Sequence, residues 1–182
     1  MAGILKVDTI QRAGSDSDQI TLSSSGVNLF NPIMKTNSGT TAMTIDGSGR
    51  ILTPARPSFH VATSATQDGG TVVNWNTEIF DIGGNFNTST NLFTAPIAGV
   101  YCFNCTALQA GNGAQMTISI RKNAHNDGRF IARTDGDSGE HHGCSVTALF
   151  NLAVNDTVEV YLHSGRIYGD TQFTNFTGFL LG

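Results

Sequence analysis

Apolar residues recur at every second position along most of this chain, and this period limits the folds open to it more than any other feature. Successive side chains of a strand point to opposite faces of a sheet, so alternation produces one apolar face, whereas a helix needs a period of about 3.6 residues. Clusters of Gly, Asn, Asp and Ser separate the alternating runs, and no sustained helical period occurs. Charged residues make up only 13% of the chain, and glycine occurs 21 times, as in chains rich in strands and turns. The sequence therefore predicts an all-β protein.

The alternating runs change in length near two prolines, Pro54 and Pro57. A residue before proline is biased towards an extended backbone, so we place a hinge there and divide the chain into residues 1–55 and 56–182. After the hinge, turn signals recur about every 8–12 residues, which is the spacing of a sandwich or barrel. We expect strands at 57–64, 71–81, 91–94, 99–109, 115–122, 129–134, 144–152, 157–163 and 171–181.

Each of these strands is expected to have one buried face. In the strands predicted at 115–122 and 157–163, apolar residues alternate with polar ones such as Thr117, Ser119 and Glu159. Because neighbouring side chains lie on opposite faces, we expect the apolar set to face the core and the polar set to face away from it.

The first 55 residues carry an internal repeat. Residues 20–29 align without gaps on residues 43–52, an offset of 23 residues, so the repeated unit is a strand, a glycine turn and a second strand. Further short strand-like pieces lie at 4–10 and, within the repeats, at 19–22, 27–30, 42–45 and 50–52.

A unit too short to bury its own apolar side needs neighbours, and with two repeats here we expect them to come from other chains. Three such segments wound about one axis would form a thin β-rich stalk that hides Ile20, Leu22, Met43 and Ile45. The alternative is a flexible tail that carries a chance repeat.

Charge and cysteine content exclude several classes of protein. The net charge is −4 with scattered Lys and Arg, so neither nucleic acid nor an anionic membrane is an expected partner. No run approaches the about 18 apolar residues of a membrane span, and the first residues do not resemble a secretory signal.

Cys102, Cys105 and Cys144 cannot all pair within one chain, so reduced thiols are expected. The odd offset of Cys102 and Cys105 in a strand points their sulfurs to opposite faces, which does not suit a shared metal or a redox pair.

The block from Trp75 to Phe103, together with the last strand, resembles the signature of complement component 1q-like heads. The matching aromatic, acidic and glycine positions are Asp81, Phe86, Phe93, Gly99, Tyr101 and Phe103. Two positions depart from the pattern, because Trp75 replaces a Phe and Cys105 replaces the last aromatic residue. Residues 176–181 are similar to the last strand of the family.

This resemblance covers about residues 56–182 and implies a ten-stranded jelly-roll sandwich that forms compact homotrimers, with binding surfaces on the apex or between subunits. Large apolar side chains in such a core contribute about 1.5–3 kcal/mol each when fully buried, and glycines allow close approach of the backbone. The residues expected to define the core are Trp75, Phe86, Phe93, Gly99, Tyr101, Phe103, Phe176, Gly178 and Phe179.

A second resemblance concerns the first domain. Residues 2–11 and the Thr-Ile-Asp-Gly-Ser-Gly unit at 44–49 resemble the starts of bacteriophage fibre and appendage proteins, whose first part anchors in the virion. This resemblance implies that residues 1–55 bind other virion proteins, and that the protein is assembled in the host cytoplasm and resides in the virion.

Candidate site residues lie in the loops that a rigid β scaffold would present. We choose Arg129, His141, His142, Arg166 and Tyr168 as binding residues, because Tyr and Arg are enriched at binding hot spots.

The loop after the strand predicted at 129–134 is a candidate metal site. The carboxylates of Asp135, Asp137 and Glu140 could bind Ca²⁺, as some relatives of such heads do. The alternative, which we favour, is a solvated polar loop, and no other cofactor is expected.

Catalysis is not expected. The chain has no Gly-x-Ser-x-Gly unit and no phosphate-binding glycine motif before a helix, and an exposed loop would not separate the pKa values of Asp135 and Asp137. The leading hypothesis is a trimeric phage tail fibre or appendage whose head binds a host-surface glycan or protein, or a neighbouring virion protein. The alternative in the same class is a capsid decoration or stabilising trimer. A secreted lectin-like or cytokine-like protein would need a signal sequence or a collagen-like stem.

Overall fold

The computed structural model describes residues 9–11, 19–23, 26–29, 33–35, 38–39, 41–111, 114–124, 131–135 and 141–181, with the backbone alone for those up to residue 29 and for 131–135. Within these residues the regular secondary structure consists of strands, and they include no helix of the length and apolar character needed to cross a membrane. The chain divides into two compact units, Met1–Ala55 and Arg56–Gly182.

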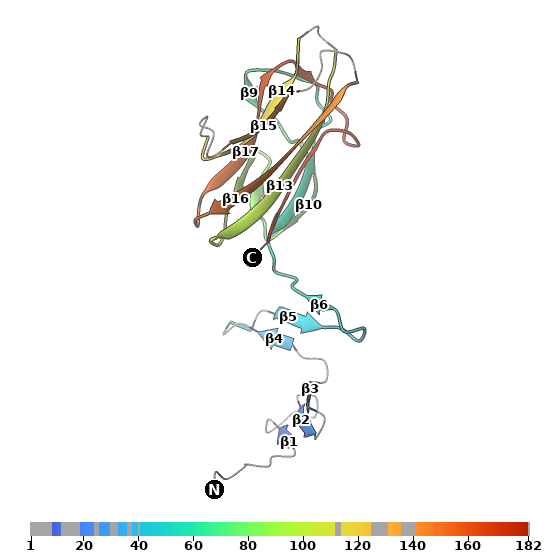
Figure 1. The fold of residues 1–182 in the computed structure, drawn as a ribbon, viewed down its shortest axis with the longest axis vertical. Helices are drawn as coiled ribbons and strands as arrows, with labels where there is room; N and C mark the ends of the chain where they lie inside the picture. The colour runs from blue at the N-terminus through green and yellow to red at the C-terminus, as the bar shows by residue number, and fades with distance from the viewer. Residues whose placement is uncertain are drawn as a thin grey trace. The chain divides into compact units, whose positions relative to one another are not determined.

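The larger unit, which we call the head, is a sandwich of two antiparallel sheets (Figure 1). The first sheet has the spatial order β10 (Thr77–Ile82), β7 (Ser58–Ala62), β19 (Asn175–Leu180), β13 (Gly99–Leu108) and β16 (Gly143–Leu152). The second sheet has the order β11 (Phe86–Asn87), β12 (Leu92–Thr94), β17 (Thr157–Ser164), β14 (Thr117–Lys122) and β15 (Ile131–Asp135). Among the described residues three short strands are added, since β9 (Thr71–Val72) pairs with β17, and β8 (Gln67–Asp68) pairs with β18 (Arg166–Ile167). This topology confirms the all-β jelly-roll fold predicted for the head.

Aromatic side chains fill the space between the two sheets. The ring of Phe59 in β7 lies 5.2 Å from that of Phe93 and 5.1 Å from that of Phe176. Phe103 of β13 lies 5.5 Å from Phe93, which links the two sheets through one continuous cluster. The other buried aromatic residues named from the sequence are Trp75, Phe86 and Tyr101.

Gly178 in β19 allows the rings of Phe59 and Phe103 to pack directly against the backbone. A Cβ atom added there would lie 2.5 Å from Cε1 of Phe59 and 2.6 Å from Cδ1 of Phe103, well inside van der Waals contact. The two rings therefore occupy the space that any other residue would need. Gly99, the other glycine named from the sequence, is half-buried at the start of β13.

Phe179 is not a core residue, and the expectation that it would be one is wrong. Its side chain is 45% exposed, and burial along β19 alternates so that Phe176, Gly178 and Leu180 face the core. Because Phe176 and Phe179 are three residues apart, an odd offset, a strand must place them on opposite faces.

Two strands of the second sheet are buried on both faces, which corrects the expectation of one buried face each. Thr117, Ser119 and Glu159 are all buried, although they lie on the side of β14 and β17 that faces away from the core. Glu159 lies directly across from Arg121 and forms an ion pair with it, so its buried charge is compensated.

The strand predicted at 71–81 is interrupted. β9 ends at Val72 and β10 begins at Thr77, and residues between them form hydrogen bonds that pair a backbone N–H with a side-chain oxygen. The backbone N–H of Trp75 donates to Oδ1 of Asn91 at 2.7 Å, and that of Ser64 donates to Oδ1 of Asn76 at 3.0 Å.

The described residues of the smaller unit form two three-stranded antiparallel meanders. The first contains β1 (Thr9–Gln11), β2 (Gln19–Ser23) and β3 (Gly26–Leu29), and the second contains β4 (Ile33–Lys35), β5 (Thr41–Ile45) and β6 (Ile51–Leu52). The repeat is therefore one strand longer than the predicted unit, because β1 and β4 precede the matching hairpins. Of the strand predicted at 4–10, residues 4–8 lie outside the described part.

The second meander leaves much of its apolar surface uncovered. Met43 and Ile45 are half-buried, while four other apolar side chains are exposed: Ile33, Met34, Ile51 and Leu52. The side chains of Ile20 and Leu22 lie outside the described part, so their predicted burial is not tested.

Candidate functional site

Leu108, the last residue of β13, and Gln109, which follows it, hold two loops at the end of the head farthest from the chain entry at Arg56. The backbone N–H of Gln109 donates to the carbonyl of His142, and its carbonyl accepts from the N–H of His141, both at 2.8 Å. On the other side, the N–H of Tyr168 donates to Leu108 O at 2.7 Å. Gln109 is fully buried, so these loops are fixed to the scaffold by backbone bonds that avoid solvent. We call this end of the head the apex.

Four of the five predicted binding residues meet at the apex. The rings of His141 and Tyr168 pack edge to face with centroids 5.1 Å apart, and His142 follows on the same loop. His141 has a φ of 61°, in the left-handed region that few non-glycine residues adopt. His141 and His142 are exposed, and Arg166 belongs to β18 immediately before Tyr168. The apex therefore presents imidazole, phenol and guanidinium groups on a rigid base.

Arg166 is held by Asp68 of β8. Its Nε and Nη2 atoms donate to the two carboxylate oxygens at 2.7 and 3.1 Å, a bidentate pair. The hydrogen bond from Arg166 lowers the pKa of Asp68, and the charge of the guanidinium adds to this effect. Both side chains are substantially exposed, so the pair fixes the orientation of Arg166 more than it stabilises the fold.

The remaining predicted site residues cannot be placed with the apex. Arg129, Asp137 and Glu140 lie outside the described residues. Asp135 ends β15, where its backbone pairs with Thr117, and its side chain is outside the described part. The side chains that the structure does describe include no group of three His, Cys, Asp or Glu that could hold a metal. Ca²⁺ binding by Asp135, Asp137 and Glu140 stays a prediction.

A polar layer on the second sheet was missed from the sequence. Arg121 pairs with Glu159 and its Cζ lies 3.8 Å from the centroid of the Tyr161 ring. Ser119 Oγ lies 2.8 Å from Nε2 of His163, the contact that a nucleophile and its base would make. Ser119 is fully buried, however, so no substrate can reach its hydroxyl, and the pair serves packing. These residues come together only through the pairing register of β14 with β17, and no sequence motif predicts that register.

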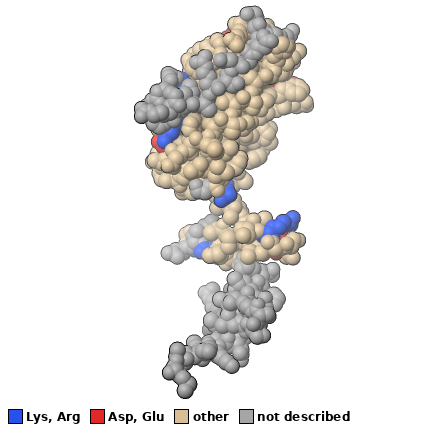
Figure 2. Space-filling view, in the orientation of Figure 1, with Lys and Arg blue, Asp and Glu red and all other residues tan. Residues whose placement is uncertain are grey.

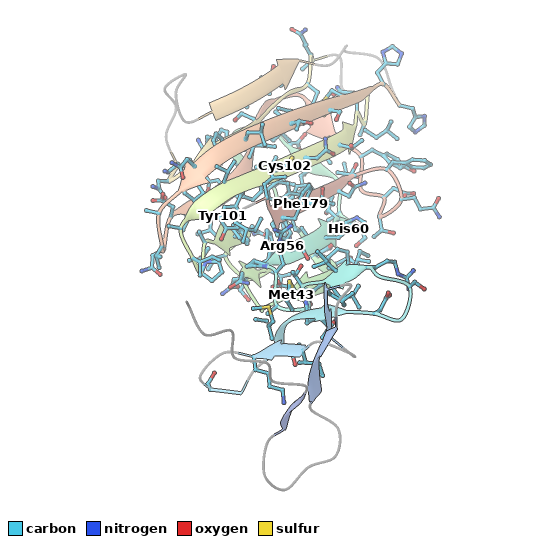
Figure 3. The ribbon with its side chains drawn as sticks, turned by 60° about the horizontal axis from the view of Figure 1, so that its bottom comes forward. Met43, Arg56, His60, Tyr101, Cys102 and Phe179 are labelled. Carbon is cyan, nitrogen blue, oxygen red and sulfur yellow. The ribbon has the colours of Figure 1, made fainter. Side chains whose placement is uncertain are left out.

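The outward side of the first sheet is a second candidate surface that sequence analysis did not identify. Alternation along its strands directs Cys102 and Asn104 of β13, and Leu149 of β16, away from the core. Cys102 lies across from Phe179 of β19, which lies across from Ser58 of β7 (Figure 3). Cys105 points the opposite way into the core, as its offset from Cys102 predicts, and burial raises the pKa of its thiol, with a smaller effect from Cys144.

This surface carries no Lys, Arg, Asp or Glu on the described strands β7, β19, β13 and β16. We call it the uncharged face. Figure 2 shows one broad side of the head, on which uncharged side chains cover most of the described surface. Its outward residues are Ser58, His60, Val100, Cys102, Asn104, Thr106, Leu108, Ser145, Thr147, Leu149, Asn151, Asn175, Thr177 and Phe179. Its exposed large apolar side chains are Val100, Leu149 and Phe179.

Comparison with known proteins gives the fold a family. A sequence model of the C1q domain matches residues 58–181, which is the head from β7 to its last strand. The chain belongs to the C1q domain family. Domains of this family generally form homotrimers.

Individual relatives agree with this assignment. Caprin-2 of Danio rerio is 28% identical over 134 residues, covering 71% of this chain, and the match spans only 14% of the length of that relative. The globular domain of zebrafish complement 1qA matches with a TM-score of 0.52 and 20% identity, over 69% of this chain and 98% of that one. Murine APRIL matches with a TM-score of 0.53 and 15% identity, over 69% of this chain and 99% of the other. At these identities the two structures support the fold alone.

Proposed function

We propose that this protein is a trimeric, non-enzymatic component of a bacteriophage particle, a fibre or appendage with a C1q-type head. In this proposal residues 1–55 form a β-rich stalk that anchors to other virion proteins. The apex of the head binds a host-surface glycan or protein, or a neighbouring virion protein, and the protein resides in the virion.

The observation that carries the proposal is the repeated meander before the head. Each meander has only three short strands, and in the second one Ile33, Met34, Ile51 and Leu52 are exposed. An isolated sheet of this size cannot bury enough apolar surface to be stable in water. Three copies packed around a common axis would cover these side chains and build a stalk.

The apex supports the recognition part of the proposal. Its aromatic and polar groups stand on backbone bonded to β13, so they lose little conformational freedom on binding a ligand. Among the described residues of the apex, no nucleophile lies beside a base in a buried position, and the proposal is binding and not catalysis.

Two alternatives share the trimeric head. A capsid decoration protein would use the same stalk to clamp shell subunits. The alternative of another class is a secreted lectin-like or cytokine-like recognition protein outside any virus.

Labelling of virus particles separates these options. An antibody against the purified head, coupled to gold, would be applied to particles of the virus whose genome encodes the chain. Label at the tail or at single appendages is the expected result, and a shell-wide pattern would identify a decoration protein. Particles that carry no label, with the protein found only in the surrounding medium, would refute the virion assignment.

The role of the apex has its own test. Binding of the full chain to host cells, or to an array of host-surface glycans, would be compared with that of Tyr168→Ala and His141→Ala. We expect these variants to fold normally and to lose binding, whereas a change at the distant exposed residue Val154 should leave it intact.

A further inference from the structure

Tyr168 at the apex stands on backbone whose two polar groups both bond to inner parts of the head. Its N–H donates to Leu108 O at 2.7 Å, and its carbonyl accepts from Oγ1 of Thr174 at 2.9 Å. The same Oγ1 accepts from the backbone N–H of Leu108 at 3.3 Å. The Thr174 hydroxyl thus closes a ring of three hydrogen bonds that joins Tyr168 to the end of β13.

Thr174 itself is fixed to the first sheet. It is fully buried and immediately precedes β19. Its carbonyl accepts from the N–H of Thr63, just beyond β7, at 3.2 Å, and its own N–H donates to Asp170 O at 2.9 Å. A threonine hydroxyl has one proton and two lone pairs, so it can accept from Leu108 and donate to Tyr168 at the same time. Because Thr174 has no exposed surface, it cannot touch a ligand at the apex.

The residue after Tyr168 is held from a second direction. The N–H of Gly169 donates to Oγ1 of Thr66 at 3.2 Å. A Cβ atom at Gly169 would lie 2.4 Å from both the carbonyl carbon of Ala65 and the backbone nitrogen of Thr66, so the two backbones can approach this closely only because the residue is glycine. Bonds on both sides of Tyr168 therefore limit the directions that its ring can take.

We infer that Thr174 is a positioning residue of the apex, whose buried hydroxyl holds the Tyr168 ring against His141 and so sets the affinity for a ligand that Thr174 does not touch. The inference rests on recognition by the apex, which belongs to the proposed function, and deepens it. A ring that is already held in place does not have to be ordered when a ligand binds, and this saving appears as affinity. Without the hydroxyl, Leu108 N–H and the Tyr168 carbonyl lose their shared partner, which favours movement of the loop towards water.

Fluorine NMR of the full-length protein measures the setting of the ring without any ligand. The chain has three tyrosines, so labelling with 3-fluorotyrosine gives one signal for each of them. The variant Tyr168→Phe identifies the signal from the apex. The signals of Tyr101 and Tyr161 serve as internal references in the same sample.

Three threonine variants carry the test. Thr174→Val keeps the branched shape of the side chain and removes the hydroxyl, and Thr174→Ser returns the hydroxyl without the methyl group. Thr157→Val is the matched control, because Thr157 begins β17 at the end opposite the apex and its Oγ1 donates to Oδ1 of Asn123. All spectra are recorded at a temperature at which circular dichroism shows every variant to be folded.

We expect Thr174→Val to shift and broaden the Tyr168 signal alone, whereas Thr174→Ser and Thr157→Val should give the wild-type spectrum. Binding is then measured with whole host cells and with virus particles that lack the protein as the two probes. Thr174→Val should lower the apparent affinity about tenfold, the equilibrium equivalent of one neutral hydrogen bond, and Thr174→Ser should restore it.

If Thr174→Val does not fold, Thr66→Val at an exposed position replaces it, because it removes the bond to Gly169 and should alter the same signal. A Tyr168 signal that stays unchanged in the variant used overturns the inference and leaves the proposed function standing. An altered signal with unchanged binding also overturns it, since the setting of the ring would not then determine affinity. A wild type that binds neither probe refutes recognition by the apex and the inference with it, so the wild type tells the two failures apart.

Discussion

Substitution of Gly178 by alanine tests the packing of the head most sharply. The new Cβ would lie 2.5 Å from Phe59 Cε1 and 2.6 Å from Phe103 Cδ1, whereas carbon atoms prefer about 3.5–4.0 Å, so each ring must move by about 1 Å. Neither ring is free to do so, because both also pack against Phe93 and Phe176. Overpacking costs typically 1–3 kcal/mol, and the displacement of two rings places this change near about 3 kcal/mol, of which a less flexible unfolded chain offsets about 0.4–1 kcal/mol. We expect a net loss of about 2 kcal/mol.

Gly143 provides the matched control. It lies in β16 of the same sheet, and a Cβ there would meet its nearest atoms at 3.9 and 4.0 Å, which is ordinary contact. Thermal unfolding at one fixed protein concentration should show a melting temperature lower by about 8 °C for Gly178→Ala and unchanged or slightly higher for Gly143→Ala. Combining Gly178→Ala with Phe103→Leu should cost less than the sum of the two changes, because the smaller side chain relieves the clash. Equal melting temperatures for the two alanine variants would refute the packing argument.

Two further predictions concern charged groups of the head. Burial alone would raise the pKa of Asp156, but hydrogen bonds from Asn123, Lys122 and a backbone N–H lower it to about 2. The Asp156 carboxylate therefore makes its full contribution to the free energy of unfolding above about pH 4, and this contribution is lost as the pH falls towards 2. Asp156→Asn should therefore cost about 2 kcal/mol in urea unfolding at pH 7 and nothing near pH 2, and a cost independent of pH would contradict this. Arg166→Ala should leave the melting temperature unchanged while weakening any binding at the apex, because its ion pair is exposed; a large loss of stability would show that Arg166 is structural.

The fold of the head could be predicted from the alternation of apolar residues and the spacing of the aromatic residues. In a strand, the order of apolar and polar residues shows directly which face is buried. Burial in β13 follows every second residue from Tyr101 to Ala107, as the sequence pattern requires. The same rule, applied to β19, would have placed Phe179 outside, and the error came from grouping aromatic residues by type without counting their offset. Trp75 was correctly predicted as a core residue although it lies in the gap between β9 and β10. Its burial does not require the backbone hydrogen bonds of a continuous strand.

The parts that escaped prediction depend on which strands are neighbours. The ion pair of Arg121 with Glu159 spans two strands that are 38 residues apart, and it explains why a polar position can be buried. The uncharged face likewise exists only because β13, β16 and β19 lie side by side, so its residues are scattered along the sequence. At the apex, by contrast, His141, His142, Arg166 and Tyr168 were identifiable as loop residues, but the backbone bonds through Gln109 that join them were not.

The mass of the full-length protein in solution tests the central claim most directly, namely that this C1q-type head works as a trimer. Three chains of 19.2 kDa give 57.6 kDa. Sedimentation equilibrium at micromolar concentration should return that mass as a single species, and it should persist on moderate dilution. A single species of 19.2 kDa at the same concentration would contradict the account.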